Sequence, residues 1–471
     1  MLLNRRGIIK KGLLLSGACA LPRFSLAMAR PTAGHGAEGR YILRADYGSH
    51  QLVADYSTEI LGFNGQFPAP VIRVKQGEVL RVRFENHLNE ASTIHWHGIR
   101  LPIDMDGVPG ISQAPVAPGE SFDYEFRCPD AGTFWYHPHI NSIRQLGMGM
   151  VGVLIVEEKA ASPYEEHIIG LKDWRLDRRG GYLPLSIPRE AARDGTLGTI
   201  NTVNGRQRPT IEIGAGQFVR LRIANMDNTR VYRPSIDGVS SRILSLDGSP
   251  LTPHRPFELT PLGAGMRMDL AFQAPDTENQ EFILADRKGR FNIELCRLKT
   301  VARGAERQGD TVATIKPENL PTLPPNPIPQ PDLHKAESLS FVFEWQGALS
   351  PTGKDGKVDH SFWLINRRAW GDHSHEHLPE PLATLERGKT YIVDLHNATP
   401  HHHPIHLHGM IFTVLTSDKR AVNPYQSDTI LLEKNERARI AFVADNPGRW
   451  MFHCHVIEHM KTGLMGYLAV V

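Results

Sequence analysis

The segment from His453 to His459 carries the residues of this chain that are best suited to binding a metal. It reads His-Cys-His-Val-Ile-Glu-His, so one thiol lies between two imidazoles and a third imidazole follows five residues after the cysteine. Side chains of a strand alternate between its faces, so we expect His453 and His455 on one face and Cys454 on the other. A thiolate with imidazoles is the ligand set of a blue-copper site. The segment therefore predicts one metal at Cys454 and His459, with a second metal site behind it at His453 and His455.

Four His-x-His pairs are candidate metal ligands, namely His95/His97, His137/His139, His406/His408 and His453/His455. Two residues apart on a strand, the rings of a pair point to the same side, with Cα atoms roughly 6.5–7 Å apart. A single such pair is often just two exposed histidines on the surface of a strand. For the segment 453–459, the alternative is a buried free cysteine among structural histidines. Four pairs instead predict a cluster of about three metals, at two to three imidazoles per metal. His403, Cys454 and His459 remain for a separate site, and zinc suits this ligand set less well.

Three stretches of the chain repeat one pattern of alternating apolar residues, a glycine and a closing asparagine. They run from Asn64 to Asn86, from Asn204 to Asn225 and, more loosely, from Asn366 to Asn397. Alternation of this kind predicts half-buried strands separated by turns. We therefore expect an all-β fold of three tandem Greek-key β-sandwich domains.

We expect the three domains at residues 40–160, 161–303 and 336–471, with a proline-rich linker at 304–335 that is stiff and extended. A histidine pair begins nine residues after Asn86 and again nine residues after Asn397, whereas the same offset from Asn225 gives Pro234. The outer domains thus carry the metal chemistry. The middle domain is a spacer or a positioning element.

The composition fits this organisation. A chain of 471 residues is too long for one ordinary core, and 42 glycines with 34 prolines suit a fold rich in turns. Because 53 basic residues balance 51 acidic ones, a nucleic-acid-binding surface is not expected. Cys128 and Cys296 form a disulfide or stay separate, since spacing alone does not set connectivity.

The first 29 residues resemble an export signal. Arg5 and Arg6 precede an apolar run, Leu13 to Leu21, that is too short to span a bilayer, and Ala27-Met28-Ala29 fits a cleavage site. Paired arginines are typical of twin-arginine signals, so we expect recognition by that export machinery and a periplasmic location after the signal is removed. A general secretory signal and a lipid anchor at Cys19 are the alternatives. No later segment suggests stable membrane insertion.

Taken together, the motifs make the chain resemble the multicopper oxidases, the family that contains laccases, ascorbate oxidase and bacterial cuprous oxidases. The motifs are His95-Trp96-His97-Gly98, His137-Pro138-His139, His403-Pro404-Ile405-His406-Leu407-His408-Gly409 and the segment 453–459. The resemblance implies cupredoxin-like domains and four copper ions. It assigns the type 1 copper to His403, Cys454 and His459, and the type 2 copper to His95 and His406. The type 3 pair of coppers would take His97, His137, His139, His408, His453 and His455.

The resemblance also implies a reaction. A reductant would give single electrons to the type 1 copper, the electrons would pass through Cys454 to the neighbouring histidines, and dioxygen would be reduced to water at the cluster of the other coppers. Asp106 follows the first histidine pair and matches an acid near the cluster in this family. It would support a copper-bound water and relay protons, and an ordinary Asp-Gly turn is the alternative.

Two positions depart from many bacterial relatives. Leu464 stands where they have an axial methionine, which should raise the type 1 potential, unless a shift of register lets Met465 serve instead. Met460 stands where they often have a glutamate on a proton path.

The electron donor is expected to be a phenol or a metal ion, docking where His403 and His459 present ring edges at the surface. A histidine-rich segment, 373–377, could gather metal ions there or could be an exposed polar loop. A non-enzymatic cupredoxin scaffold, used in cell-envelope assembly or copper holding, is the alternative function. The intact set of ten histidines and one cysteine favours the enzyme.

Overall fold

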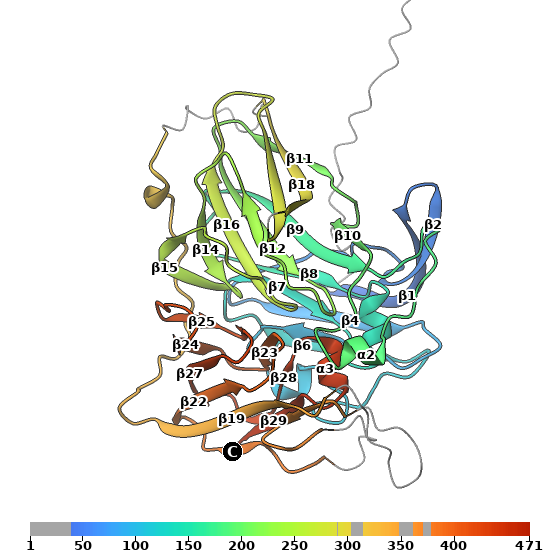
Figure 1. Ribbon diagram of the computed structural model, residues 1–471, viewed down its shortest axis with the longest axis vertical. Coiled ribbons are helices and arrows are strands. Elements are labelled where there is room, and N and C mark those ends of the chain that lie inside the picture. Colours follow the sequence, from blue (N-terminus) through green and yellow to red (C-terminus); the bar gives the residue numbers. More distant parts are fainter. Residues whose placement is uncertain (1–38, 290, 303–313, 348–360, 371–377) are drawn as a thin grey trace, which may run out of the picture. The chain divides into compact units, whose positions relative to one another are not determined.

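A computed structural model of the chain describes residues 39–289, 291–302, 314–347, 361–370 and 378–471. Strands dominate this part of the chain and form six sheets (Figure 1). The α-helices in it are short and comprise α1 (Ser142–Gly147), α2 (Pro188–Ala191) and α3 (Ile457–Lys461). The predicted all-β fold class is therefore confirmed. The predicted export signal and the 373–377 segment lie outside the described residues.

The first sheet pair, as we call the two sheets formed by residues 41–157, holds two of the four His-x-His pairs. Its strands are β1 (Tyr41–Val53), β2 (Tyr56–Phe63), β3 (Ile72–Lys75), β4 (Val79–Asn86), β5 (His95–His97), β6 (Ser121–Arg127), β7 (Gly132–His137) and β8 (Gly152–Glu157). One sheet has the order β2-β1-β4-β6 and the other β3-β8-β7-β5. A short 3-10 helix, η1 (Ile103–Met105), precedes Asp106.

The middle sheet pair spans residues 165–301. Its strands are β9 (Glu165–Trp174), β10 (Ile200–Val203), β11 (Thr210–Gly214), β12 (Phe218–Asn225), β13 (Pro234–Ile236), β14 (Arg242–Leu246), β15 (Ser249–Pro256), β16 (Arg267–Gln273), β17 (Glu281–Lys288) and β18 (Phe291–Val301). The sheet orders are β10-β9-β12-β16-β14-β15 and β11-β18-β17-β13.

The last sheet pair spans residues 337–470. Its strands are β19 (Glu337–Trp345), β20 (Trp363–Ile365), β21 (Ala383–Leu385), β22 (Thr390–Asn397), β23 (His403–Leu407), β24 (Phe412–Ser417), β25 (Tyr425–Ser427), β26 (Thr429–Leu432), β27 (Arg437–Val443), β28 (Gly448–Cys454) and β29 (Met465–Val470). The sheet orders are β20-β19-β22-β27-β24-β25 and β21-β29-β28-β23-β26.

The three sheet pairs share one connectivity. In each pair the first strand runs parallel to the strand that ends in the repeated asparagine, as β1 to β4, β9 to β12 and β19 to β22. The other sheet of each pair also contains one pair of parallel neighbours, namely β3 with β8, β11 with β18 and β21 with β29. The structure thus repeats one topology three times. The division at the predicted domain boundaries remains our interpretation of these sheets.

The repeated asparagines explain why the sequence pattern recurs. The side-chain amide of Asn86 donates to the carbonyls of Glu90 and Val116, and its carbonyl accepts from the backbone N–H of Leu88. Asn225 and Asn397 make the same three kinds of bond in the other two sheet pairs. Each asparagine therefore closes the loop that leads into the next strand, which in the first and last sheet pairs carries a His-x-His pair.

The alternating pattern of the strands buries one face of each sheet. In β4, Leu80, Val82 and Phe84 are buried while Arg81 is exposed. The apolar cores of the first and last sheet pairs are continuous, whereas most of the middle pair has a core of its own. The two histidine-bearing sheet pairs are consequently packed together.

The proline-rich linker packs along the protein. In its described part, 314–335, the regular element is the 3-10 helix η3 (Pro317–Asn319). Leu320 and Leu323 are buried in a small apolar cluster with residues of the middle sheet pair. Asn326 makes hydrogen bonds with the backbone of Ala131 in the first sheet pair.

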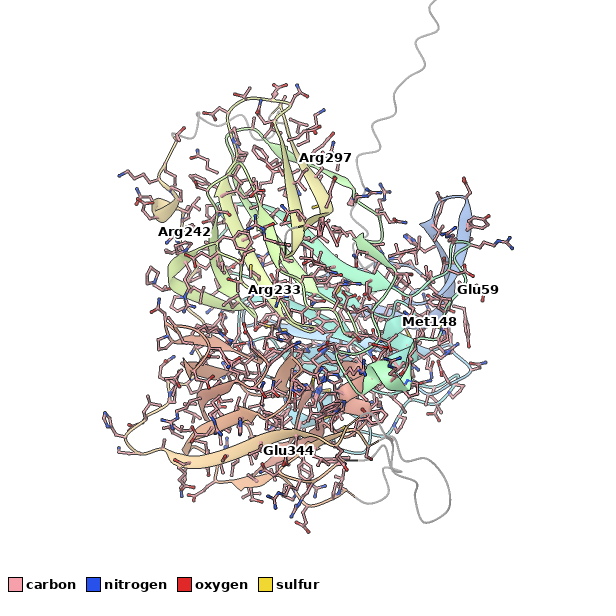
Figure 2. All side chains as sticks on the ribbon, in the orientation of Figure 1. Glu59, Met148, Arg233, Arg242, Arg297 and Glu344 are labelled. Carbon is pink, nitrogen blue, oxygen red and sulfur yellow. The ribbon has the colours of Figure 1, made fainter. Side chains whose placement is uncertain are left out.

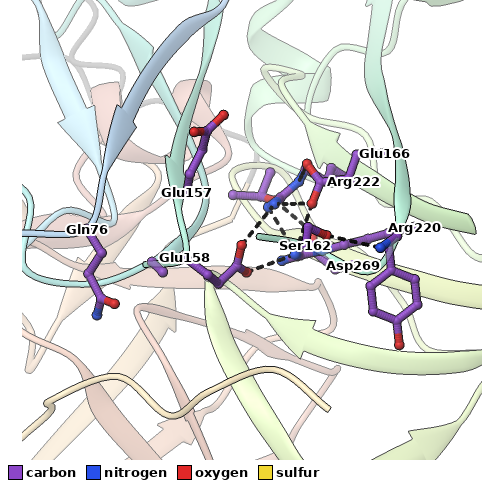
Figure 3. Close-up of polar contacts among 12 residues, drawn as sticks. Gln76, Glu157, Glu158, Ser162, Glu166, Arg220, Arg222 and Asp269 are labelled. Carbon is purple, nitrogen blue, oxygen red and sulfur yellow. Dashed lines mark hydrogen bonds and ion pairs between the residues drawn. The ribbon is translucent and has the colours of Figure 1, made fainter. Parts of the chain in front are cut away.

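A buried ion network ties the middle sheet pair to the first (Figure 3). Arg220 donates to Asp269 at 2.6 Å and to Glu158, which follows β8, at 2.8 Å. Arg222 donates to Thr133 of β7 at 3.0 Å. Figure 3 shows the two guanidinium groups and their carboxylates pointing toward one another. Removing one partner from such a network would leave a buried charge uncompensated. Because Thr133 lies in β7, the network also holds the strand that carries His137 against the middle sheet pair.

Cys128 and Cys296 do not form a disulfide. Within the described residues both are buried free thiols, in the cores of different sheet pairs. The same part of the chain has no helix with the length and apolar character needed to cross a membrane.

Candidate metal centre

Two antiparallel ladders bring the four histidine pairs together. β5 runs beside β7, which sets His95 opposite His137. β23 runs beside β28, which sets His406 opposite His453. The first and last sheet pairs thus present the same arrangement of imidazoles. The ring centroids of His95 and His406, one from each sheet pair, lie 5.9 Å apart.

The eight histidines form one buried cluster. None is more than 5% exposed. Rings from opposite sheet pairs stack, His97 on His406 at 3.8 Å and His95 on His408 at 4.0 Å between centroids. The rings of His453 and His455 lie 5.7 Å apart. The four His-x-His pairs therefore meet where the first and last sheet pairs pack together.

Many ring nitrogens of the cluster have no protein partner. Among the described residues, no hydrogen-bond partner exists for Nε2 of His95, His137, His139 and His406, Nδ1 of His97, and both ring nitrogens of His455. Buried polar atoms are rarely left unpaired. Imidazole nitrogens with free lone pairs are good copper ligands. The donor set therefore fits bound metal ions better than it fits a hydrogen-bonded histidine network.

Ligand atoms of this cluster meet in several groups of three, all within 4.8 Å of one another. The groups are His95/His406/His408, His95/His97/His137, His139/His408/His453 and His97/His406/Asp428. His95 and His406 fall in one group, together with His408. Because the groups share residues, they would place several metal ions next to one another.

The outward nitrogens of the rings are held by hydrogen bonds. His95 Nδ1 donates to the carbonyl of Asp106 at 2.8 Å, and His453 Nδ1 donates to the carbonyl of Cys454 at 2.8 Å. His408 Nδ1 donates to the Asp106 carboxylate at 2.9 Å. Such bonds fix the tautomer and orientation of a ligand ring. Asp106 is buried and touches two of the histidines, so it is a part of this centre.

Asp428 was not among the residues predicted from sequence, yet it touches two rings of the cluster. Its carboxylate accepts from His97 Nε2 at 3.2 Å, which leaves His97 Nδ1 free, and its backbone carbonyl accepts from His406 Nδ1 at 2.9 Å. Arg267 of the middle sheet pair grips the same carboxylate through two nitrogens, at 2.6 and 2.9 Å. Burial disfavours the charged carboxylate, but Arg267 more than offsets it and lowers the pKa of Asp428.

Two glycines leave room for this contact between sheet pairs. Gly98 has a φ of +87°, and a Cβ there would lie 2.6 Å from the Asp428 carboxylate and would also meet the Arg267 guanidinium. A Cβ at Gly265 would lie 2.7 Å from the ring of His455. The middle sheet pair has no His-x-His pair, but Gly265 and Arg267 line the cluster. It acts as a positioning element.

Nine of the ten site histidines are neutral near pH 7. Burial lowers the pKa below the ordinary value of 6.5 for nine of them, namely His97, His137, His139, His403, His406, His408, His453, His455 and His459. For His453 and His459 the pKa falls to about 3. Neutral imidazole is the form that binds metals.

These lowered pKa values predict that the copper-free protein loses stability on acidification. A histidine with an ordinary pKa when unfolded and a lower one when folded binds its proton preferentially in the unfolded chain. Its stabilising contribution is complete above pH 6.5 and is lost as the pH falls toward the folded value of about 3. Between these two pH values, each such histidine lowers the free energy of unfolding by up to about 1.4 kcal/mol for every pH unit of acidification. Urea unfolding of the metal-free protein should show the midpoint falling steeply below pH 6.5, and a midpoint that stayed constant there would contradict the prediction.

A second donor set lies beside the cluster. The Nδ1 atoms of His403 and His459 are 3.0 Å apart, and each is 3.6 Å from Cys454 Sγ. The outer nitrogens are engaged, since His403 Nε2 donates to Thr399 Oγ1 and His459 Nε2 donates to the carbonyl of Arg193. Burial raises the pKa of the Cys454 thiol, but a coordinating metal deprotonates a thiol outright. These three side chains fit one soft metal ion.

The predicted surface position of the second site's ring edges is wrong. His403 and His459 are both 0% exposed. The segment around α2, residues 186–196, lies against this site, and the carbonyl of Arg193 within it accepts from His459 Nε2. Glu458, also not predicted, fixes this segment because its buried carboxylate accepts from Ser186 Oγ at 2.6 Å and Thr196 Oγ1 at 2.8 Å. A donor therefore cannot touch either ligand ring directly.

Leu464 rather than Met465 accompanies the second donor set. Leu464 is buried in the same apolar core cluster as Cys454, and its carbonyl accepts from the Cys454 backbone N–H at 3.0 Å. Met465 lies in a different cluster, with Met460. The alternating strand thus turns the methionine away from the cysteine. The shift of register considered from the sequence does not occur.

Comparisons with known proteins identify a family for the chain. A family model described as multicopper oxidase matches residues 45–161, and a second with the same description matches residues 349–471. The crystal structure of a multi-copper oxidase from Pseudomonas thermotolerans is 47% identical, with a TM-score of 0.81, over 92% of this chain and 99% of that one. Laccase-2 of Botryotinia fuckeliana is 27% identical over 87% of this chain and 78% of the laccase. A multicopper oxidase of Staphylococcus aureus is 24% identical over 91% of this chain and 88% of its own length.

Proposed function

Because the chain belongs to the multicopper oxidase family, we propose that it couples one-electron oxidation of a phenolic or metal-ion donor to four-electron reduction of dioxygen to water. Family membership itself makes the protein a copper-binding oxidoreductase that uses oxygen and a reductant. The finer statements concern the number of ions, their ligands and the donor. The observation that carries them is the set of buried imidazole nitrogens that find no partner among the described residues.

We assign the ligands as follows. His403, Cys454 and His459 would hold the type 1 copper, and His95 with His406 the type 2 copper. The type 3 coppers would be held by His97, His137, His139, His408, His453 and His455. Eleven donors at two to three per ion correspond to about four copper ions. Support comes from the two separate donor sets, one built around sulfur and one of imidazoles alone.

Bound copper would supply the redox chemistry and the binding of oxygen, while the protein positions the donor groups. Cys454 belongs to the second donor set, and its chain neighbours His453 and His455 belong to the cluster. The main chain around Cys454 is therefore a short covalent connection for electrons between the two sets. Asp106 touches His95 and His408, so its carboxylate is placed to hold and pass a proton at the cluster.

Met460, which stands where many bacterial relatives have a glutamate on a proton path, cannot carry a proton. It is buried among apolar residues, so a proton path through that position is not available from its side chain. The other carboxylate that touches the cluster, Asp428, is paired with Arg267, so proton delivery would depend on Asp106. Its carboxylate is fixed by His408 at 2.9 Å.

The non-enzymatic scaffold considered from the sequence is not supported. The chain's relatives are oxidases and laccases, and it covers 99% of the Pseudomonas thermotolerans enzyme. Export by the twin-arginine route to the periplasm stays part of the proposal, and it rests on the paired arginines and the cleavage motif of residues 1–29.

Metal analysis combined with oxygen uptake tests the proposed function. Copper-loaded protein should contain about four copper ions per chain, show one intense blue band and consume one dioxygen for every four electrons taken from hexacyanoferrate(II). Release of hydrogen peroxide in place of water, or a single bound ion, would contradict the proposal. Parallel measurements with a phenol, manganese(II) and copper(I) would identify the preferred donor.

Leu464→Met is expected to lower the type 1 potential. The side chain packs in the cluster that contains Cys454, and leucine cannot ligate, whereas a thioether at this position can donate to the copper and stabilise its oxidised state. Redox titration of the blue band measures the shift. The matched control is Met465→Leu, which lies in the other apolar cluster and should leave the potential unchanged. An unchanged potential in Leu464→Met would disprove the axial assignment.

A further inference from the structure

The covered ligands of the type 1 site raise the question of where an electron enters. His403 and His459 are both 0% exposed, and the outer nitrogen of His459 is engaged by the Arg193 carbonyl. A donor must therefore act across at least one other group of the protein. The ring that contacts both histidines is that of Trp363, whose centroid is 4.3 Å from His459 and 4.9 Å from His403.

Trp363 is itself buried, with 0% exposure. Its Nε1 donates to the carbonyl of Ala191 at 2.9 Å, which ties the segment around α2 to the ring. The indole is thus fixed in orientation and packed against the type 1 histidines. Among the described residues it is the aromatic side chain in contact with both ligand rings, so it offers the electron a path from a neighbouring ring.

A second indole continues the path to the surface. Trp345 ends β19, whose Glu344 is labelled in Figure 2, and its centroid is 6.5 Å from that of Trp363 with 31° between the planes. Trp345 is 38% exposed. His401 packs edge-on to both indoles, at 5.4 and 5.5 Å. His401 Nδ1 donates to the exposed carboxylate of Asp194 at 2.9 Å, and this bond fixes the imidazole in its position.

We propose that the exposed ring of Trp345 is the docking face for an aromatic one-electron donor, and that Trp363 carries the electron by tunnelling from this face to His403 and His459. The inference rests on the proposed function, because the electron acceptor is the type 1 copper. Trp345 offers a flat apolar face suited to stacking, while the polar groups beside it, His401 and Asp194, already pair with each other. The site therefore favours a planar ring over a metal ion.

The electron balance is simple. A phenol that docks on Trp345 loses one electron and its hydroxyl proton and becomes a phenoxyl radical. The electron would be accepted by the copper held at His403, Cys454 and His459, which would be the one-electron oxidant, and the proton would go to solvent water. Neither tryptophan is oxidised, since both serve as a bridge. Trp345 is thus a specificity residue and Trp363 a positioning residue for electron entry.

Binding to copper-free protein tests the docking face without any copper chemistry. Guaiacol, a simple phenol, is titrated and followed by NMR. Trp345→Ala should raise its Kd by about three- to tenfold, the loss expected for one aromatic contact, and Trp345→Phe should restore most of the affinity. Tyr56→Ala is the matched control, because Tyr56 of β2 is 43% exposed and belongs to the first sheet pair. Equal Kd values for the parent and Trp345→Ala would overturn the proposal.

Anaerobic bleaching of the blue band tests the electron path in the copper-loaded protein. At low guaiacol, Trp345→Ala should slow the bleaching by about three- to tenfold, with the colour, the type 1 potential and the reoxidation by oxygen unchanged. Hexacyanoferrate(II), which does not stack, should bleach the variant at the parent rate. An equal loss for both donors, or no loss for guaiacol, would overturn the docking role. Absence of a blue band in the parent protein would instead mean that the proposed function has failed.

Discussion

Replacing Cys454 by serine is expected to remove the blue absorption of the copper-loaded protein and to reduce the oxidation of every donor to background. The cysteine sulfur lies 3.6 Å from each of the two facing nitrogens of His403 and His459. A thiolate is a soft donor that binds copper strongly, whereas a serine hydroxyl stays protonated and is a hard, weak donor. In the proposed assignment the same change breaks the connection between the two donor sets, because the sulfur would be the atom that joins the type 1 ion to the main chain between His453 and His455.

Absorption spectra, copper analysis and oxygen uptake measure the outcome together. The variant should lose one copper ion and retain those of the imidazole cluster, whose ligand nitrogens come from other side chains. Cys128→Ser is the matched control, since Cys128 is also a fully buried free thiol but lies in the core of the first sheet pair. It should keep its colour and its turnover. Donor oxidation that persisted in Cys454→Ser would show that electrons reach the cluster without this sulfur.

The histidine cluster could be predicted because it depends on short-range geometry. Residues two apart on a strand face the same side, so His95 with His97 and His406 with His408 are paired by the backbone alone. The repeated asparagines also have a local cause, because each closes a loop through bonds within a few residues of itself and to one neighbouring loop. Where a residue's role depends on its own strand or turn, the pattern of the sequence is sufficient.

Contacts between distant segments could not be predicted in this way. Arg267 and Asp428 are 161 residues apart in the chain, and each lies in a strand or loop whose local pattern gives no sign of a partner. A charged residue in an alternating strand is usually a solvent-facing one. A signal was present only in Ser427-Asp428-Thr429, where three polar residues precede the apolar run of β26, and it suggests a buried polar site without saying what it binds.

The burial of His403 and His459 was missed for the same reason. The segment around α2, which lies against them, comes from the middle sheet pair, more than 200 residues earlier in the chain than the histidines. It is held in place by Glu458, whose carboxylate reaches Ser186 and Thr196. Local sequence around a ligand predicts the ligand, but not what another part of the chain places over it.

Replacing Arg267 by methionine is expected to destabilise the folded protein by about 3–5 kcal/mol, the usual result of removing one partner from a buried ion pair. Arg267 is buried and contacts the carboxylates of both Asp428 and Asp247. Burial already raises the pKa of Asp247 to about 7, with Arg267 opposing the shift. Without the guanidinium, two carboxylates would face each other in the interior, and Asp428 would take up a proton or turn away from His97.

Loss of Asp428 from its position should also lower the affinity of the histidine cluster for copper. His97 would lose the acceptor that keeps its Nδ1 free for a metal, and second-sphere changes of this kind lower metal affinity by about 10–100-fold. Urea unfolding and copper analysis of the variant measure the two effects.

The double variant Arg267→Met/Asp428→Asn should recover part of the stability, because it removes the uncompensated charge, but it should not recover the copper affinity. Arg297→Met is the matched control, because Arg297 pairs with Glu281 on the exposed face of β18 and should cost no more than about 1 kcal/mol. Equal destabilisation by the two arginine replacements would show that Arg267 does not hold the middle sheet pair to the cluster.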